Sequence, residues 1–374
     1  MAAGGQEGKS PRGMKQAARP ADGGARSINI DTRFDTMTEK LLDTDNEDTI
    51  RMSVNEAKAL GTDALAGLGY RPEEAAVIAA HLVDAATWGY EFAGLPRILV
   101  IAERPELKKP RAPVSIVRET PVSALLDGGN NVGYISLNHA VEVVIEKVRQ
   151  SGIAIVGLRN SWFAGRNAYY LEKIAREGFA TLYFGSSSPT VVPPGAMRKA
   201  LGTNPIAIAL PGKADPFIFD MGTASVMSGE LLMKAFLGES FHEVVGIDKH
   251  GEPTRVASEL LEGGVLPFGG HKGYGLSLAI QALGLMAGAR MRNGDVSDFG
   301  YLFVAFNPEL LMPTEQFTSE MEELLAKVRG LPRQAGVSEI RVPSERGFRE
   351  RELRRKQGIL VNKRVVERLR QLTE

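Results

Sequence analysis

Helical and strand patterns alternate over residues 136–220, and this alternation constrains the fold more than any other feature of the chain. The segment 136–152 carries apolar residues at helical spacing and ends at a glycine, which suits a helix terminus. A second helical segment covers 167–178. Four short apolar runs predict buried strands: 153–158, 180–185, 205–210 and 216–220. The sequence therefore predicts an α/β fold with a mostly buried sheet.

Helical patterns also flank this core. Order is expected to begin near Met52, where Ser53 or Asn55 can cap a first helix. Residues 71–89 predict a second helix, and charged amphipathic helices are expected over 318–329 and 345–357. The first 50 residues are basic and then acidic, without an apolar period, which predicts a disordered tail. An RNA-binding arm is disfavoured because aromatic residues are nearly absent there.

Composition excludes several classes of function. Lys plus Arg equals Asp plus Glu at 45 each, so a general polyanion binder is disfavoured and no nucleic-acid partner is expected. The chain has no cysteine, which excludes disulfides, thiolate catalysis and cysteine-ligated metals. No apolar run approaches the roughly 20 residues of a membrane span, and the N-terminus lacks a signal-peptide core. These absences predict a cytoplasmic protein without a membrane partner.

The common phosphate-binding motifs are missing. No G-x-G-x-x-G opens a helix after a strand, and no G-x-x-x-x-G-K-[ST] occurs. The five histidines lack ligand spacing, so no metal site is expected. His81 lies in an apolar helical run and is interpreted as a packed or surface residue.

The segment LPFGGHKGYGLSLAIQALG, residues 266–284, places glycines and two basic side chains before a run that is apolar on every side. The glycines allow close approach of backbone N–H groups, and a helix starting near Tyr274 directs its positive end to the same place. His271 and Lys272 add donors and charge. The segment predicts a phosphate or carboxylate site at the mouth of a buried helix. An ordinary loop with solvated side chains is the open alternative.

Two further segments offer ligand groups. Thr203 and Asn204 precede an apolar strand and can donate hydrogen bonds at a sheet edge, or they form a simple turn. Asp220 ends another strand, where carboxylates often meet ligands in α/β folds, although capping of the next helix is the common alternative.

Six segments in this order resemble the type-2 malate/L-lactate dehydrogenase family: DGGNNVG (127–133), RNSWFAGRNAYY (159–170), LGTNPIAIALP (201–211), FIFDMGTAS (217–225), LPFGGHKGYGL (266–276) and RVPSERGFRE (341–350). The family includes sulfolactate and ureidoglycolate dehydrogenases, diketogulonate reductase, and reductases of Δ1-piperideine-2-carboxylate and Δ1-pyrroline-2-carboxylate. The resemblance covers about residues 53–365. It implies a non-Rossmann NAD(P)-binding mixed sheet flanked by helices, and a homodimer with the active site near the subunit interface.

The resemblance also implies residue roles. Thr203 is expected to touch the substrate or the nicotinamide side, and Glu345 and Arg346 to close over the nucleotide. His271 and Lys272 are expected to hold its phosphates. The residues assigned to the cofactor are Phe163, Ala164, Gly165, Arg166, Asn167, Asp220, Met221, Gly222, His271, Lys272, Glu345 and Arg346.

The same resemblance suggests a domain plan. We expect a tail over 1–50, a helical and dimerisation domain formed by 51–125 with 318–374, and a nucleotide-binding α/β core over 126–317.

The chain departs from the family at its acid/base position. The family carries Ser-His-Gly followed by an arginine, whereas this chain reads EFAGLPR, with Phe92 and Ala93 in place of Ser and His. An alanine cannot move a proton, so alcohol–ketone interconversion should be impaired by roughly 10²–10⁴-fold. A protonated ketimine already carries its proton on nitrogen. Arg97 survives and can bind a substrate carboxylate through two hydrogen bonds.

Other departures concern the pocket. A second family histidine is replaced by Phe163, and the glycine of Pro-Gly-Glu by Ser344. The pocket should be aromatic and dry, with walls from Trp88, Tyr90, Phe92 and Phe163. Substitute proton donors to consider are Tyr90, Glu91 and His139.

We therefore predict an NAD(P)H-dependent reductase of a carboxylate-bearing cyclic ketimine or an unusual 2-oxo acid, with secondary metabolism as its setting. The catalytic candidates are Arg97, Tyr90, Glu91 and Thr203. An inactive nucleotide-binding paralogue and a non-redox enzyme that reuses the pocket stay open. NADPH is preferred to NADH because three arginines could meet a 2′-phosphate: Arg159, Arg166 and Arg198.

Overall fold

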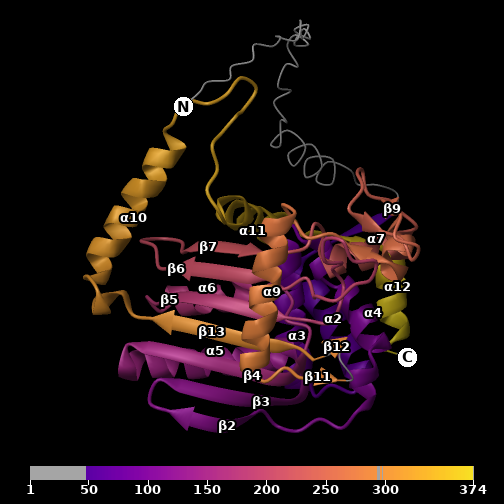
Figure 1. The fold of residues 1–374 in the computed structure, drawn as a ribbon, viewed down its shortest axis with the longest axis horizontal. Helices are drawn as coiled ribbons and strands as arrows, with labels where there is room; N and C mark the ends of the chain where they lie inside the picture. Colours follow the sequence, from indigo (N-terminus) through magenta and orange to yellow (C-terminus); the bar gives the residue numbers. More distant parts are fainter. Residues whose placement is uncertain (1–47, 293–294, 297, 374) are drawn as a thin grey trace, which may run out of the picture. The chain divides into compact units, whose positions relative to one another are not determined.

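A seven-stranded mixed sheet forms the centre of the structure, a computed structural model that describes residues 48–292, 295–296 and 298–373 (Figure 1). The strand order is β2-β3-β4-β13-β5-β6-β7. β3 and β4 run parallel, and the other neighbours are antiparallel. The strands are β2 (Ser115–Thr120), β3 (Ser123–Val132), β4 (Ile153–Trp162), β5 (Ala180–Ser186), β6 (Ile206–Leu210), β7 (Phe217–Met221) and β13 (Gly300–Phe306). The predicted α/β fold with a mixed sheet is confirmed.

The two faces of this sheet are covered unequally. α5 (Gly133–Ser151) and α6 (Ala168–Arg176) pack on one face, where Val156, Phe303 and Tyr183 lie opposite one another and are fully buried. α9 (His271–Met286) crosses the other face over β5 and β13 (Figure 1). Beyond α9 the second face is open, with Ile155 and Phe219 exposed. The sheet therefore presents apolar side chains that the described chain does not cover.

Helices from both ends of the described chain pack together. α11 (Glu345–Gln357) packs on α3 (Pro72–Thr87), and α12 (Lys363–Gln371) packs on α2 (Val54–Gly67) and α4 (Pro96–Glu103). β1 (Thr49–Met52) pairs with β14 (Ile359–Asn362). In Figure 1, α10 (Thr314–Arg329) lies beyond one end of the strands, and α2, α3, α4 and α12 lie toward the opposite end. The predicted three-part domain plan stays a prediction.

A second, smaller core joins the segment after β5 to the segment before α9. It contains α7 (Ser228–Leu237), α8 (Ala257–Glu262) and the short strands β8 (Gly246–Ile247), β9 (Pro253–Thr254) and β10 (Gly264–Val265). The remaining short elements are η1 (Glu91–Ala93), η2 (Pro105–Lys108), η3 (Pro308–Leu310), β11 (Met291–Arg292) and β12 (Asp295–Val296).

Most local predictions agree with the structure, and three do not. Ser53 caps α2 in a reciprocal capping box with Glu56. The first described strand, β1, starts at Thr49, ahead of the predicted start near Met52, because β14 provides a pairing partner that the local sequence does not reveal. α9 starts at His271 rather than near Tyr274, and it is not buried: Leu278, Leu285 and Met286 are exposed because the sheet covers only one side of the helix.

The predicted tail lies outside the described residues except for its last three positions. Among the helices of the described chain, none is both long enough and apolar enough to span a bilayer.

Candidate functional site

A cavity of about 850 Å³ lies where the helical group, one end of the sheet and the smaller core meet. Its walls come from α3, η1, α4, the loop after β4, the loop after β5, the end of β7 and the start of α7. The aromatic residues that line it are Trp88, Tyr90, Phe92, Tyr134, Phe163, Phe219, Phe299 and Tyr301. The aromatic pocket predicted from four of these residues is therefore confirmed.

Arg97 is held in the cavity wall by the first turn of α4, which starts at Pro96. The residue is only 9% exposed, and its Cζ lies 4.4 Å from the ring centroid of Phe163. Its Nη1 has no hydrogen-bond partner among the described residues. Burial raises the pKa of the adjacent Tyr134 phenol, and the Arg97 guanidinium opposes this rise. Arg97 is thus a largely desolvated cation that can accept an anionic ligand.

The short helix η1 places Phe92 and Ala93 in the same wall. A Cβ on Gly229 would lie 2.9 Å from Cδ2 of Phe92 and 3.6 Å from Nη1 of Arg97, so α7 begins directly beside both side chains. Ala93 therefore lies in the cavity wall and brings no acid/base group to it.

The three candidate proton donors are placed very differently. Tyr90 lines the cavity, with its ring 6.1 Å from that of Phe92. The carboxylate of Glu91 is bound by Arg354, so it is engaged in an ion pair. His139 is exposed on α5, lies 3.6 Å from Glu142, and is not among the described residues that line the cavity. Of the three, only the Tyr90 side chain has direct access to a ligand.

The loop between β4 and α6 brings Phe163, Ala164, Gly165, Arg166 and Asn167 to the cavity. Two of its residues have left-handed backbone angles, Phe163 at φ 57° and Gly165 at φ 73°. A Cβ on Gly165 would collide with the ring of Tyr134, so the chain approaches α5 more closely than any other residue type allows.

His81 supports this loop from behind. Its Nε2 accepts a hydrogen bond of 3.0 Å from the backbone N–H of Arg166. The ring is fully buried among Tyr134, Tyr169 and Tyr170. Burial, and then the charges of Arg166 and Lys173, hold the pKa of His81 well below its usual value. A neutral, packed histidine agrees with the sequence interpretation.

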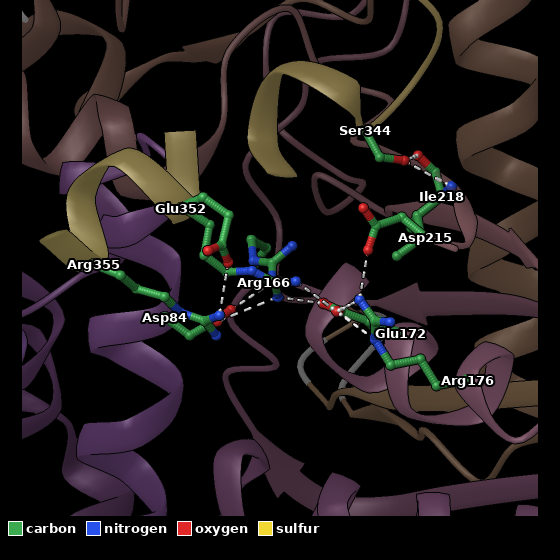
Figure 2. Close-up of polar contacts among 10 residues, drawn as sticks. Asp84, Arg166, Glu172, Arg176, Asp215, Ile218, Ser344, Glu352 and Arg355 are labelled. Atoms are coloured by element: carbon green, nitrogen blue, oxygen red, sulfur yellow. Dashed lines mark hydrogen bonds and ion pairs between the residues drawn. The ribbon is translucent and has the colours of Figure 1, made fainter. Parts of the chain in front are cut away.

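The Arg166 side chain points to α3 and not to a free position. Its Nη2 lies 2.6 Å from Asp84, and its Cζ stacks 4.1 Å from the ring centroid of Trp88. Figure 2 shows this pair beside Glu172, which accepts hydrogen bonds from Arg176 and from Arg351. The network joins α3, α6 and α11 behind the cavity.

The other two arginines considered for a 2′-phosphate do not line the cavity within the described chain. Arg159 lies 3.4 Å from Asp127, and Arg198 is exposed. The geometry of these three arginines therefore adds no argument for NADPH.

Asp220 ends β7 and caps α6, not the segment that follows it in sequence. Its carboxylate accepts 2.8 Å and 3.1 Å hydrogen bonds from the Ala168 N–H and from Nδ2 of Asn167. Burial raises its pKa, and these two donors oppose the rise. Asn167 Oδ1 is buried without a partner among the described residues. Asp220, Asn167, Met221, Gly222 and Thr203 all line the cavity, so the structure brings these predicted residues together.

Asn204 has a structural role instead. It is fully buried, its Oδ1 accepts from Ser187 N–H, and its Nδ2 donates to Ser277 and Gln281.

The C-terminal segment reaches the cavity with Pro343 and Ser344. Ser344 has a left-handed φ of 75°, which explains why a glycine suits this position. Its Oγ accepts 2.8 Å from the N–H of Ile218 and donates 2.6 Å to the carbonyl of Ile218 (Figure 2). Glu345 bonds to Arg329 at 2.5 Å, and Arg346 lies 5.6 Å over the Tyr90 ring. Neither Glu345 nor Arg346 is among the described residues that line the cavity.

His271 and Lys272 lie apart from these groups. Both are exposed in the first turn of α9, and neither is among the described residues of the cavity wall. Their predicted contact with cofactor phosphates stays a prediction.

Sequence reasoning missed Tyr134 and Tyr301, whose buried hydroxyls have no hydrogen-bond partner in the described chain. Tyr134 directly follows the DGGNNVG segment, which was the available signal. Tyr301 lies in the apolar strand β13, far along the chain, and the local sequence gave no signal that it would reach the cavity.

Comparisons with known proteins agree with this geometry. The family model described as malate/L-lactate dehydrogenase matches residues 52–370. A malate dehydrogenase of Pyrococcus abyssi is 34% identical over 87% of this chain and 95% of its own length. A Δ1-pyrroline-2-carboxylate/Δ1-piperideine-2-carboxylate reductase of Pseudomonas putida is 33% identical over 66% of this chain and 74% of its own length.

A solved malate dehydrogenase of Pyrococcus horikoshii superposes with a TM-score of 0.77 at 29% identity, covering 87% of this chain and 95% of the other.

Proposed function

The chain belongs to the malate/L-lactate dehydrogenase family and is an oxidoreductase, and we propose that it is an NAD(P)H-dependent reductase of a carboxylate-bearing cyclic ketimine. An unusual 2-oxo acid is the second substrate class that we consider. One observation carries this proposal: Ala93, where the family resemblance implies an acid/base histidine, lies in the cavity wall together with the desolvated Arg97. The site retains a carboxylate clamp and lacks the usual proton donor.

The residues of the cavity fit a nicotinamide cofactor. The loop 163–167 and the end of β7 form one wall, and the unpartnered Oδ1 of Asn167 is an acceptor suited to an amide N–H. A Cβ on Gly222 would collide with Met227, so this backbone leaves no room for a side chain beside the cavity. We propose that these residues hold NADPH, with NADH as the alternative. The cofactor supplies the hydride.

The chain's own groups explain why an imine suits this site. Arg97 binds the carboxylate through charge-assisted hydrogen bonds and fixes the orientation of the adjacent C=N carbon. The aromatic wall excludes water, which strengthens that ion pair. The nitrogen of a protonated ketimine already bears its proton, so no side chain has to supply one during reduction. A ketone oxygen would need a proton, and Tyr90 is the candidate donor that lines the cavity.

A nucleotide-binding paralogue without redox activity is the second candidate function. It is favoured by the engagement of Glu91 with Arg354 and by the remote position of His139, which leave few proton donors at the site.

The decisive experiment measures cofactor oxidation by the full chain. NADPH and NADH are each tested with Δ1-piperideine-2-carboxylate, Δ1-pyrroline-2-carboxylate, pyruvate and oxaloacetate. We expect turnover with the imines and little with the 2-oxo acids. Cofactor binding without turnover of any imine would refute the reductase and support the paralogue. Faster turnover of pyruvate or oxaloacetate than of the imines would refute the preference for imines.

We also propose a homodimer. The open sheet face around Ile155 and the outer side of α9, with Leu278, Leu285 and Met286, expose apolar side chains that a second copy could bury. Sedimentation equilibrium should give twice the mass of the chain, and a monomer at micromolar concentration would contradict the proposal. Cytoplasmic location and a role in secondary metabolism stay predictions of the sequence.

A further inference from the structure

We propose that the substrate of this site carries a single carboxylate, bound by Arg97, next to a flat apolar body that packs on Phe92 and Phe163, and that dicarboxylates are rejected. This inference rests on the proposed function and deepens it by naming the substrate class. It concerns binding, so it can be tested without catalysis.

Two cations of the cavity wall, Arg104 and Arg166, are paired with carboxylates of the described chain, and Arg97 and Lys199 are not. Arg104 donates two hydrogen bonds of 2.8 Å and 2.9 Å to Glu106, and Arg166 is paired with Asp84. Lys199 donates to the carbonyl of Leu261, which places it at the α8 side of the cavity. Arg97 packs on the Phe163 ring, its Nη1 has no hydrogen-bond partner, and no carboxylate pairs with it among the described residues. Arg166 also has unpartnered guanidinium nitrogens, but its charge is compensated by Asp84. The wall therefore provides one carboxylate site next to the aromatic residues.

Next to the aromatic residues a second carboxylate would find no compensating charge, because Lys199 lies at the α8 side of the cavity. The acidic residues that line the cavity are Glu103 and Asp220, which repel an anion. The faces of aromatic rings carry partial negative charge and are poor neighbours for a carboxylate. An unpaired anion moved from water to such a wall is strongly disfavoured.

The same rings favour a flat apolar substituent. Phe92 lies beside Gly229 at the start of α7, where a Cβ would already approach Phe92 to 2.9 Å. The Phe163 ring packs on Arg97, with its centroid 4.4 Å from Cζ. The family resemblance implies a serine and a histidine where this chain has Phe92 and Phe163. These two substitutions exchange polar contacts for apolar surface, and a ring or cyclic imine gains by contact with it.

A matched pair of ligands tests this inference directly. 3-Phenyllactate and malate share the 2-hydroxy acid and differ in a phenyl group against a second carboxylate. Both tryptophans of the chain report on the site, because Trp88 lines the cavity and Trp162 lies 5.5 Å from the Phe163 ring. Fluorescence titration, with calorimetry as a second readout, should give a Kd for phenyllactate that is on the order of 10- to 100-fold lower than that for malate. Equal affinities, or tighter binding of malate, would overturn the inference.

Variants at Phe92 test the residue basis of the preference. Phe92→Ser should reduce the phenyllactate-to-malate preference about tenfold, and Phe92→Leu, which keeps apolar surface but loses the flat ring, should reduce it less. Phe236→Ser is the matched control, since Phe236 is 44% exposed on α7 and is not among the described lining residues. An unchanged preference in both Phe92 variants would overturn the role of this ring.

The two proposals can fail separately. Selective binding of phenyllactate without reduction of any imine refutes the reductase and leaves the substrate class standing. Reduction of imines by a protein that binds malate as tightly as phenyllactate refutes the substrate class and leaves the reductase standing.

Discussion

The glycine-rich start of α9 has a conspicuous sequence motif but lies outside the cavity wall of the described chain, whereas the wall around Arg97 has an inconspicuous sequence and forms the centre of the site. The glycine-rich segment has a conspicuous motif, yet His271 and Lys272 are exposed and lie outside the cavity wall of the described chain. The wall around Arg97 has no conspicuous motif: its local sequence reads EFAGLPR, with Ala93 where the family resemblance implies a histidine. Nevertheless this wall contains the aromatic rings and the Arg97 guanidinium, whose Nη1 has no hydrogen-bond partner among the described residues.

This contrast shows that a motif along the chain does not by itself identify a site. The site also depends on which distant residues the fold brings together. A glycine run with basic residues can be read along the chain, whereas Arg97 acquires its character from Phe163 and Gly229, which are far away in sequence. Variants in the two regions should therefore differ in size of effect, with the largest at Arg97.

Arg97→Ala should produce the largest change. Loss of a desolvated guanidinium removes charge-assisted hydrogen bonds to the substrate carboxylate and should raise KM about 10- to 100-fold. The measurement is steady-state kinetics with an active imine. Arg118→Ala is the control, because Arg118 is exposed on β2. A KM within twofold of wild type for Arg97→Ala would remove the clamp from the mechanism.

Ala93→His should restore part of the family's acid/base function. We expect reduction of pyruvate to increase about tenfold or more, because a positioned general acid contributes about 10²–10⁴-fold. The protonated imidazole is the donor, so this gain should fall as pH rises through its pKa, ordinarily about 6.5. Imine turnover should change little. Ala93→Gln, similar in size and without a titrating group, is the control. An equal gain in Ala93→Gln would show that polarity alone, and not proton transfer, was restored.

His81 should give a smaller effect, on stability and its pH dependence. The pKa of His81 is lowered in the folded state, so at acidic pH the unfolded chain binds a proton on this residue and the folded chain does not. This contribution to stability is therefore present above pH about 6.5 and declines as pH falls below it, by up to about 1.4 kcal/mol per pH unit.

Urea unfolding between pH 7 and acidic pH should show a flatter profile for His81→Gln than for wild type. His139→Gln is the control, since His139 is exposed on α5 and should keep the wild-type profile. Identical profiles for all three proteins would mean that His81 does not carry the dependence.

Features that depend on residues close together in sequence were predicted correctly, and features that depend on contacts between distant segments were not. Helices such as 72–87 and the buried strands were readable because periodicity and caps are local. Strand β1, Thr49–Met52, was not, because it depends on pairing with β14 near the other end of the described chain. The aromatic pocket was predicted from family positions. The engagement of Arg166 with Asp84 and of Glu91 with Arg354 was not, since those pairs join segments up to 263 residues apart.

Lys272→Ala should give the smallest effect, and it tests the glycine-rich start of α9. An exposed cation contributes about 0.2–1 kcal/mol to an ionic contact, so we expect the Kd for NADPH to rise less than about fivefold. Lys58→Ala, an exposed site on α2, is the control. A rise of about tenfold or more, absent in the control, would place the α9 segment on the cofactor phosphates. Because Lys272 lies outside the cavity wall of the described chain, that result would further require a rearranged chain or a second copy to complete the site.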